Sequence, residues 1–279
     1  MDSLATQVIV DSLKNTHSES GGSWILHHVM DGNYLDFTPF GKIYLPHLEI
    51  FGFDISITRH VVFMWLAAIL LTYVFIKVAK SYQNSLVPKG STNFWEVFIV
   101  FVRDEIAKPT IGKGYERFLP YLLTAFFFIL FGNFLGLIPF SATFTSNIAV
   151  TATLATMSFL VIQLGGIKNN GFLGYFKGLI PHGVPVFLLP IMVVVELLGL
   201  FTKPFALAIR LFANMTAGHI VIYALISLIF VMQSYLISPV SIGMALFIYG
   251  LEVLVALLQA YIFTMLSSLF IGMAVHQEH

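Results

Sequence analysis

Between Leu179 and Val275 the chain is almost continuously apolar, and this feature restricts its possible folds more than any other. The charged residues of the stretch are few: Glu196, Lys203, Arg210 and Glu252. A hydrocarbon core about 30 Å thick is crossed by a helix of about 20 predominantly apolar residues. The stretch is several times longer than one such helix, so it predicts membrane-spanning helices.

Composition agrees with this interpretation. The 279 residues are 58% hydrophobic and 10% charged, whereas a soluble domain carries about 25% charged residues. The chain has no cysteine, which excludes disulfides, thiolate metal sites and cysteine nucleophiles. With a net charge of zero and no basic cluster, no nucleic-acid partner is expected. The sequence contains no GxxxxGK[ST] motif for nucleotide phosphates, and no cofactor is expected.

The first part of the chain divides into an arm and three apolar runs. Residues 1–58 hold seven Asp or Glu against two Lys, which predicts an acidic arm with a small hairpin near residues 31–56. Residues 59–80 have the length of a first transmembrane helix. Residues 118–167 contain two further apolar runs, which predict a transmembrane helical hairpin.

Residues 93–108 follow a different pattern. Apolar side chains recur there at helical spacing, and charged side chains take other positions. The apolar set is Phe94, Val97, Phe98, Phe101 and Val102, and the charged set is Glu96, Arg103, Asp104 and Lys108. This arrangement is typical of an amphipathic helix at the membrane interface rather than of a span.

The last hundred residues allow two interpretations. Residues 187–233 stay apolar for 47 residues, about 70 Å if they are fully helical. They form either two spans with a tight turn near Lys203 and Pro204, or one long tilted helix. The turn would lack Gly and Asn, and residues 240–275 pose the same choice. We therefore predict two long tilted helices within residues 186–275, with Pro190 and Pro204 as local kinks.

Lysine and arginine asymmetry predicts the orientation. Seven Lys or Arg lie between Lys77 and Arg117 and two more lie in residues 168–185, whereas residues 141–147 and 233–239 hold none. The basic side is expected in the cytoplasm, which places the acidic arm outside. The expected fold class is an all-α polytopic membrane protein with about five crossing helices and one interfacial helix, the last two crossings being long and tilted.

Polar residues of the penultimate helix occupy two faces. At 100° per residue, Glu196, Lys203 and Arg210 fall seven residues apart and share one stripe, with Asn214 one turn further on. His219 lies nine residues from Arg210, about 900° around the axis, and faces the opposite side. The penultimate helix therefore has two polar sides.

The last helix has one polar face, which carries Glu252 and Gln259, seven residues apart. Measured from residue 236, in the connection between the helices, His219 lies 17 residues back and Glu252 lies 16 forward. Antiparallel helices rise equally from a shared turn, so we expect these two residues at one depth. By the same measure, Arg210 and Gln259 match in depth.

Structural explanations exist for each polar residue taken alone. An arginine at the centre of a span costs roughly 2.5–3.5 kcal/mol, and Arg210 and Glu252 can offset this cost as a buried ion pair that fixes helix packing. Asn214 and Gln259 can join helices by hydrogen bonds, and His219 can be a satisfied bundle histidine. Taken together, six polar residues at membrane depth indicate an ion path.

Two stretches resemble a known family. TKPFALAIRLFANMTAGHI (202–220), followed by YGLEVLVALLQAYIFTMLSSLFI (249–271), closely resembles subunit a of the F-type ATP synthase, and GNFLGLIP (132–139) resembles an earlier span of that family. The pairing of Arg-Leu-Phe-x-Asn with a downstream Gln-Ala-x-Ile-Phe is specific. The resemblance covers roughly residues 59–275.

The resemblance implies a stator subunit whose two tilted helices lie against a rotating ring of c subunits, each with one membrane-embedded carboxylate. Arg210 matches the essential arginine of the family. The other implied proton-path residues are Asn214 and Gln259 beside it, the histidine and acid pair His219 and Glu252, and Glu196 in the cytoplasmic half-channel. The order of the pair is the reverse of that in some bacterial members.

The resemblance also implies the setting of the chain. The expected partners are the c ring, the peripheral-stalk b subunits, the remaining F1Fo subunits and the lipid bilayer. The chain is not expected to be catalytic alone, and it belongs in an energy-transducing membrane, a bacterial plasma membrane in preference to an organellar inner membrane. Two other functions are open on the residues alone: a secondary transporter with a charged midplane site, and a structural subunit with an Arg–Glu pair.

Overall fold

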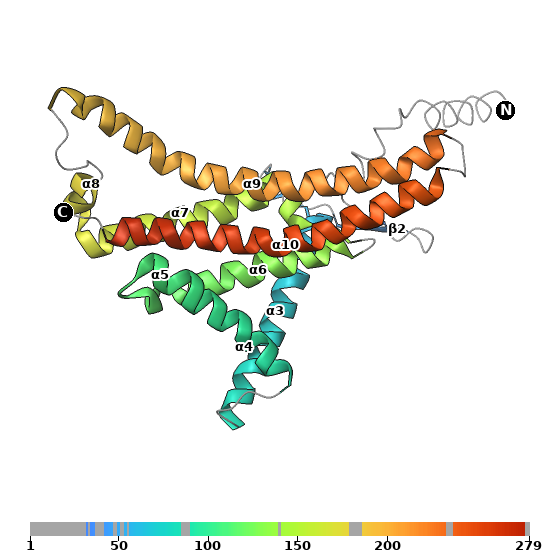
Figure 1. Ribbon diagram of the computed structural model, residues 1–279, viewed down its shortest axis with the longest axis horizontal. Coiled ribbons are helices and arrows are strands. Elements are labelled where there is room, and N and C mark those ends of the chain that lie inside the picture. Colours follow the sequence, from blue (N-terminus) through green and yellow to red (C-terminus); the bar gives the residue numbers. More distant parts are fainter. Residues whose placement is uncertain are drawn as a thin grey trace.

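The fold is a bundle of long helices (Figure 1). The structure, a computed structural model, describes residues 32, 34–36, 42–46, 49–50, 53–54, 56–84, 90–138, 141–178, 186–232 and 237–276. Within these ranges five helices are long and apolar enough to cross a membrane. They are α3 (Arg59–Asn84), α6 (Leu119–Leu137), α7 (Ile148–Asn170), α9 (Leu189–Met232) and α10 (Ser238–Val275). The predicted all-α polytopic fold with five crossings is confirmed.

Small strand pairs occur in the N-terminal arm. Strand β1 (Tyr34–Asp36) pairs antiparallel with β2 (Lys42–Tyr44), and β3 (Glu49–Ile50) pairs antiparallel with β4 (Phe53–Asp54). One hairpin was expected from the sequence, whereas two short pairs form, because turn-forming residues interrupt this segment more than once. Residues 1–31 of the predicted arm lie outside the described residues.

The predicted amphipathic segment is three consecutive helical pieces. These are α4 (Ser91–Phe101), the π-helix η1 (Val102–Ala107) and α5 (Lys108–Ile111). The segment ends at Gly112, whose φ of 72° lies in the region that favours glycine. It is separate from the five long apolar helices, as the sequence predicts for a helix that does not span.

The π-helix η1 separates a buried face from a charged one. Val102 and Ile106 are fully buried in the core. On the other side, Asp104 accepts from Arg103 at 2.8 Å and lies 2.5 Å from the Lys108 Nζ. The hydrogen bond from the Arg103 guanidinium, followed by that from Lys108, holds the pKa of the Asp104 carboxyl well below its usual range. Arg103, Asp104 and Lys108 thus satisfy one another on the side of η1 away from the core.

The middle of the chain forms the predicted helical hairpin. A short 3-10 helix η2 (Tyr115–Arg117) leads into α6, and a second, η3 (Phe144–Ser146), lies between α6 and α7. Asn147 caps α7, because its side chain accepts from the Ala149 N–H at 2.9 Å. Helix α8 (Phe172–Gly178) follows α7 directly.

The last two helices are each continuous. After the 3-10 helix η4 (Val186–Leu188), α9 runs for 44 residues, and α10 runs for 38. The interpretation with a turn near Lys203 is therefore wrong, and the single-helix prediction is confirmed. Pro204 lies inside α9, where it has no N–H to donate to the preceding turn, and Figure 1 shows that α9 is bowed. Helices of this length fit a bilayer by tilting.

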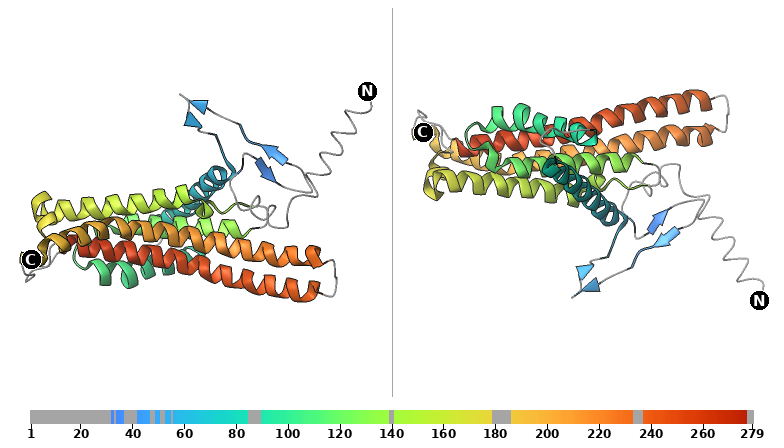
Figure 2. Two further views of the ribbon diagram at one scale, coloured as in Figure 1. Left: turned by 90° about the horizontal axis from the view of Figure 1, so that it is seen from above. Right: turned by 90° about the horizontal axis from the view of Figure 1, so that it is seen from below.

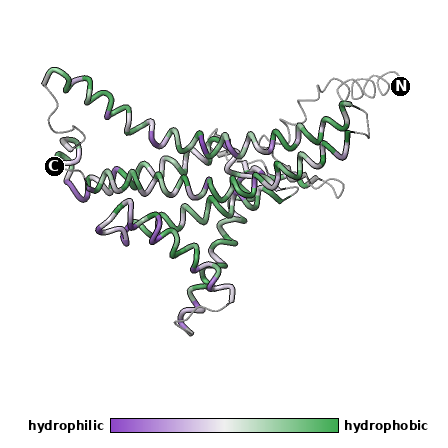
Figure 3. Tube along the Cα trace, viewed as in Figure 1, coloured by the Kyte–Doolittle hydropathy of each residue, from purple (hydrophilic) through white to green (hydrophobic). Residues whose placement is uncertain are grey.

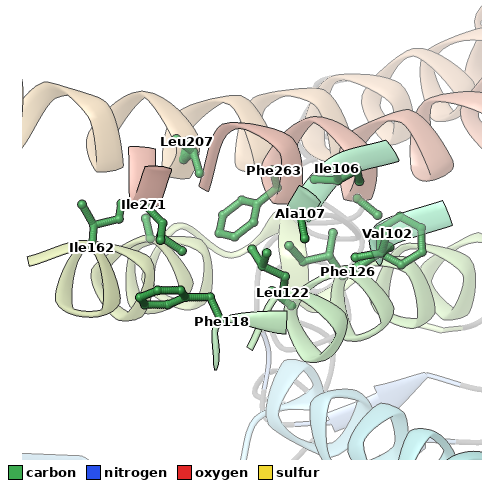
Figure 4. Packing of buried hydrophobic residues seen from close by; sticks show 14 of the residues in the cluster. Val102, Ile106, Ala107, Phe118, Leu122, Phe126, Ile162, Leu207, Phe263 and Ile271 are labelled. Atoms are coloured by element: carbon green, nitrogen blue, oxygen red, sulfur yellow. The ribbon is translucent and has the colours of Figure 1, made fainter. Parts of the chain in front are cut away.

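Helix α10 is the centre of the bundle. It packs against α9, α6, α7 and α5, while α7 also packs against α9 and α3 packs against α6 (Figure 2). The core lies along α10, and Figure 4 shows Phe263 of this helix among Ile106, Ala107 and Leu122. All four side chains are almost completely buried. Because α10 is packed on several sides, its polar face is fixed relative to α9.

Hydrogen bonds tie one end of the bundle together. Asn169 of α7 donates to the Val275 carbonyl at 2.8 Å, and Asn170 donates to the Ala274 carbonyl at 2.9 Å. His276 Nε2 lies 3.2 Å from the Lys113 carbonyl. The final carbonyls of a helix have no partner within the helix, so these contacts both satisfy the end of α10 and anchor it.

Candidate functional site

Arg210 projects from α9 on the side away from the core. The side chain is exposed, and it forms no hydrogen bond or ion pair with any residue that the structure describes. Leu207, three residues before Arg210, and Leu211, which follows it, are buried. The face that carries Arg210 also exposes apolar side chains, among them Ala206, Ala217 and Val221. Figure 3 shows isolated hydrophilic positions within the otherwise apolar α9. A buried pair between Arg210 and Glu252 does not form.

An amide pair joins α9 to α10 one turn from Arg210. Asn214 Nδ2 donates to Gln259 Oε1 at 2.8 Å. Gln259 is buried, between the fully buried Ala256 and Ala260. The sequence predicts that Gln259 lies level with Arg210, but its observed partner is Asn214, one turn further along. Counted from residue 236, Gln259 lies 23 residues forward, Asn214 lies 22 back and Arg210 lies 26 back. Helices that rise equally from that point therefore bring Gln259 level with Asn214 and about one turn short of Arg210.

Glu252 lies directly against the backbone of α9. A Cβ atom at Gly218 would stand 2.0 Å from Glu252 Oε1, so only glycine at 218 leaves room for this carboxyl. Glu252 is 8% exposed, and its Oε2 is buried without a hydrogen-bond partner among the described residues. A buried carboxyl oxygen without a partner is costly when ionised, which is a property expected of a group that exchanges protons.

His219 follows Gly218 in the chain but contacts another element. Its Nε2 lies 2.6 Å from Thr143 Oγ1, in the connection between α6 and α7. No hydrogen bond or ion pair joins His219 to Glu252 within the described part of the chain. The contact of Glu252 with Gly218 agrees with the predicted common depth of the two residues, but they do not form a direct pair.

Two glycines of α6 seat the connection that carries Thr143. A Cβ atom at Gly136 would stand 1.8 Å from Thr143 Oγ1, and one at Gly132 would stand 2.2 Å from the Phe144 ring. The spacing of these glycines places both on one face of α6. The GNFLGLIP segment thus forms the seat for this turn. Small residues four apart indicate close approach in membrane helices, and this pattern is the one sequence feature that points toward Thr143.

Further polar groups gather near His219 that the sequence does not predict. Tyr223, one turn along α9, interacts electrostatically with both Arg59 and Glu252. Ser146 Oγ lies 3.4 Å from His60 Nε2 at the start of α3. These residues belong to four separate elements, α3, η3, α9 and α10, so no periodic pattern in the sequence relates them.

The remaining predicted residue lies apart from this group. Glu196 is half-buried on α9, 14 residues before Arg210 and so about 21 Å from it along the helix. Between them, Lys203 Nζ lies 5.3 Å from the centre of the Phe270 ring on α10. The predicted residues therefore form three levels: Glu196, then Arg210 with Asn214 and Gln259, then His219 with Glu252.

A match to a known protein family extends over most of the chain and includes all of the predicted polar residues. The family described as ATP synthase A chain matches residues 61–272. The chain belongs to this family. The resemblance seen in the sequence over residues 59–275 is thereby confirmed. All of the predicted polar residues on α9 and α10 lie within the part of the chain that matches the family.

Individual relatives in the ATP synthase A chain family are similar over nearly the whole chain. ATP synthase subunit a of Chloroherpeton thalassium is 57% identical over 258 residues, which are 91% of this chain and 77% of that one. ATP synthase subunit a 2 of Chlorobaculum tepidum is 53% identical over 260 residues, covering 92% and 74%. ATP synthase subunit a of Anaeromyxobacter sp. is 48% identical over 300 residues, covering 94% and 73%.

Proposed function

We propose that the chain is the proton-conducting stator subunit of the Fo sector of ATP synthase. The observation that carries the proposal is Arg210, a cation that is exposed on the mostly apolar helix α9 and has no partner in the described chain. A charge in that position is costly in lipid, so a partner on another chain is required. A ring of c subunits, each with a membrane-embedded carboxylate, supplies such a partner.

The charge of Arg210 suits this role. A ring carboxylate must be neutral where it faces lipid, because an ionised one is far too costly there. It can ionise only where a cation and water replace its lost solvation. Arginine stays protonated at any working pH, so Arg210 stabilises the ionised carboxylate without itself carrying a proton across. It thereby blocks a direct proton leak between the two sides.

The three polar levels support two offset half-channels. His219 and Glu252 lie toward the end of α9 that faces the α6–α7 connection, and in this proposal they deliver protons from outside. Glu196 lies toward the opposite end, and it serves the cytoplasmic half-channel. Asn214 and Gln259 lie between the two and position the ring contact. Each proton crossing a potential of ~100 mV yields about 2.3 kcal/mol, so several protons are needed for each ATP.

The rest of the chain provides the frame. The acidic residues 1–58 form an external arm, residues 59–80 and 118–167 are membrane anchors, and residues 93–108 lie at the cytoplasmic interface. Peripheral-stalk b subunits and the remaining F1Fo subunits are the other partners, and ATP chemistry belongs to those subunits.

The membrane is a bacterial plasma membrane, because the relatives are bacterial. A structural subunit held by an Arg210–Glu252 pair is disfavoured, since that pair does not form.

Replacing Arg210 tests the proposal. Arg210→Ala is expected to abolish proton-driven ATP synthesis in vesicles that contain the whole complex, because nothing then stabilises the ionised ring carboxylate. Arg210→Lys is expected to function poorly, since a buried ammonium loses its proton more readily than a guanidinium. Co-purification of the ring with the variant measures assembly, which is expected to survive.

A matched control is Arg103→Ala, which removes an arginine from the half-exposed ion pair of η1 and is expected to leave synthesis close to normal. Coupled synthesis at the normal rate in Arg210→Ala vesicles contradicts the proposed role. Loss of synthesis in both variants also counts against it, because the effect would then not be specific to the site.

A further inference from the structure

Thr143 is the one hydrogen-bonding partner of His219 in the described part of the chain. Its Oγ1 lies 2.6 Å from His219 Nε2, and the side chain is only 4% exposed. The two residues are 76 positions apart in sequence. Thr143 belongs to a connection between helices rather than to a span, so it is not one of the polar residues that stand out within the apolar runs of the sequence.

The turn around Thr143 is held from several directions. Gly136 leaves the space that the Thr143 hydroxyl occupies. The Ser146 hydroxyl donates to the Thr143 carbonyl at 2.6 Å, and the Ser146 N–H donates to the same oxygen at 2.9 Å. Thr145 donates to Asn133 Oδ1 of α6 at 2.7 Å. Contacts other than the one with His219 therefore hold Thr143 in position.

A hydroxyl is suited to a ring nitrogen that changes protonation. It carries one donor and two acceptor lone pairs, and it can rotate to use either. It donates to an unprotonated Nε2 and accepts from a protonated one, so the bond survives when His219 gains or loses a proton. A carbonyl could only accept, and a methyl group could do neither.

We propose that Thr143 is a positioning residue of the external proton inlet, whose hydroxyl keeps the His219 imidazole in one orientation through both of its protonation states. The inference rests on the proposed function of His219 as a proton relay. In this inference the α6–α7 connection takes part in proton delivery, and Gly136 contributes by leaving room for the Thr143 side chain.

Other ionisable groups lie on the helices next to His219 and the Thr143 turn, and they contribute to any pH dependence. They are Arg59 and His60 from α3, Tyr223 from α9, and Tyr249 and Glu252 from α10. A pH profile measured for one chain therefore reports on the whole group. Only the difference between variants that leave all five residues intact reports on the hydroxyl of Thr143.

The test compares two pairs of side chains that each differ by one hydroxyl. Thr143→Val replaces the hydroxyl by a methyl group of similar size, and Thr143→Ser and Thr143→Ala differ from each other by a single oxygen. Proton flux through the whole complex in vesicles is measured from pH 6 to 9. Thr153→Val is the matched control, since its hydroxyl bonds only to the Ala149 carbonyl of its own helix on the exposed surface of α7.

Thr143→Val and Thr143→Ala are expected to slow proton entry about fivefold or more, which corresponds to the loss of one ordinary hydrogen bond. The pH of half-maximal flux is expected to move toward lower pH, because the protonated ring loses more than the neutral one when its partner is removed. Thr143→Ser is expected to keep both the rate and the profile, and Thr153→Val to change neither.

Equal rates and profiles for Thr143→Val, or for Thr143→Ser and Thr143→Ala, overturn the inference. So does a serine variant as slow as the alanine one, which would indicate a packing role instead. These outcomes leave the effect of Arg210→Ala untouched. If the proposed function itself were wrong, the result would be different, because the complex with the unmodified chain would then conduct no protons at all.

Discussion

At the scale of single residues, Gly218 sets the position of the Glu252 carboxyl. A Cβ atom at 218 would stand 2.0 Å from Oε1 and 2.9 Å from Cδ of Glu252, so Gly218→Ala must push the carboxyl away from α9. We expect proton entry to slow about tenfold, since a relay fails when its groups move out of hydrogen-bond reach. Dye-detected proton flux into vesicles with the whole complex measures the effect.

Gly250→Ala is the control for this change. Gly250 lies two residues before Glu252 in the same helix, and an added Cβ there would meet nothing within 4 Å. Alanine at 250 is expected to leave the flux unchanged. If Gly218→Ala conducts as well as Gly250→Ala, the close fit of the carboxyl to α9 has no part in proton delivery.

The residue scale also separates what the sequence predicts from what it does not. Arg210 and Glu252 are conspicuous because a charge within an apolar run is costly and so needs a reason. Thr143 is not conspicuous, because threonine is tolerated in membrane helices, where Thr124, Thr153 and Thr156 simply bond to carbonyls of their own helix. The role of a hydroxyl depends on what lies opposite, and only the folded chain provides that.

At the scale of elements, length and periodicity are sufficient to predict the helices but not their exact pairing. The apolar runs predict α9 and α10 as single long helices, and the amphipathic pattern predicts α4. The residue count from the connection at 236 places Asn214 and Gln259 at one depth, but the hydrogen bond between them also depends on how the two helix faces are turned toward each other, which the count does not contain. The π-helix η1 likewise has no periodic pattern that would have predicted it.

A prediction at this scale concerns the contact between α10 and α5. A Cβ atom at Gly272 would stand 2.1 Å from the Thr110 carbonyl oxygen, which is backbone and cannot rotate away. Gly272→Ala must therefore separate the two helices, and it also strains the bond of 2.6 Å between Thr110 and Ser268. Overpacking of this kind typically costs about 1–3 kcal/mol. We expect the apparent melting temperature of the purified complex in detergent to fall.

Gly243→Ala controls for the effect of alanine itself. Gly243 lies in the same helix, where an added Cβ would meet nothing within 4 Å. Alanine stabilises helix interiors relative to glycine, so this variant is expected to melt at the parent temperature or above it. A Gly272→Ala complex as stable as the Gly243→Ala complex would mean that α5 does not need its close approach to α10.

At the scale of the whole molecule, side-chain contacts sort the turns into two groups at opposite ends of the bundle. Lys113 and Asn169 contact the end of α10 at His276 and Val275. At the other end, the α6–α7 connection contacts His219 and the start of α3. The positive-inside pattern predicts this same sorting from charge alone, because the first group contains the basic segments. Packing and charge thus agree independently.

This sorting predicts which residues are reached from outside the cell. The chain has no cysteine, so single cysteines can be introduced at Ile43 in the arm, at Lys113 after α5 and at Phe172 in α8, all of which are exposed. With five crossings, Ile43→Cys is expected to react with a membrane-impermeant maleimide in intact cells. Lys113→Cys and Phe172→Cys are expected to react only after the membrane is permeabilised. The parent chain must give no label, and reaction of Lys113→Cys in intact cells would contradict the orientation on which both half-channels depend.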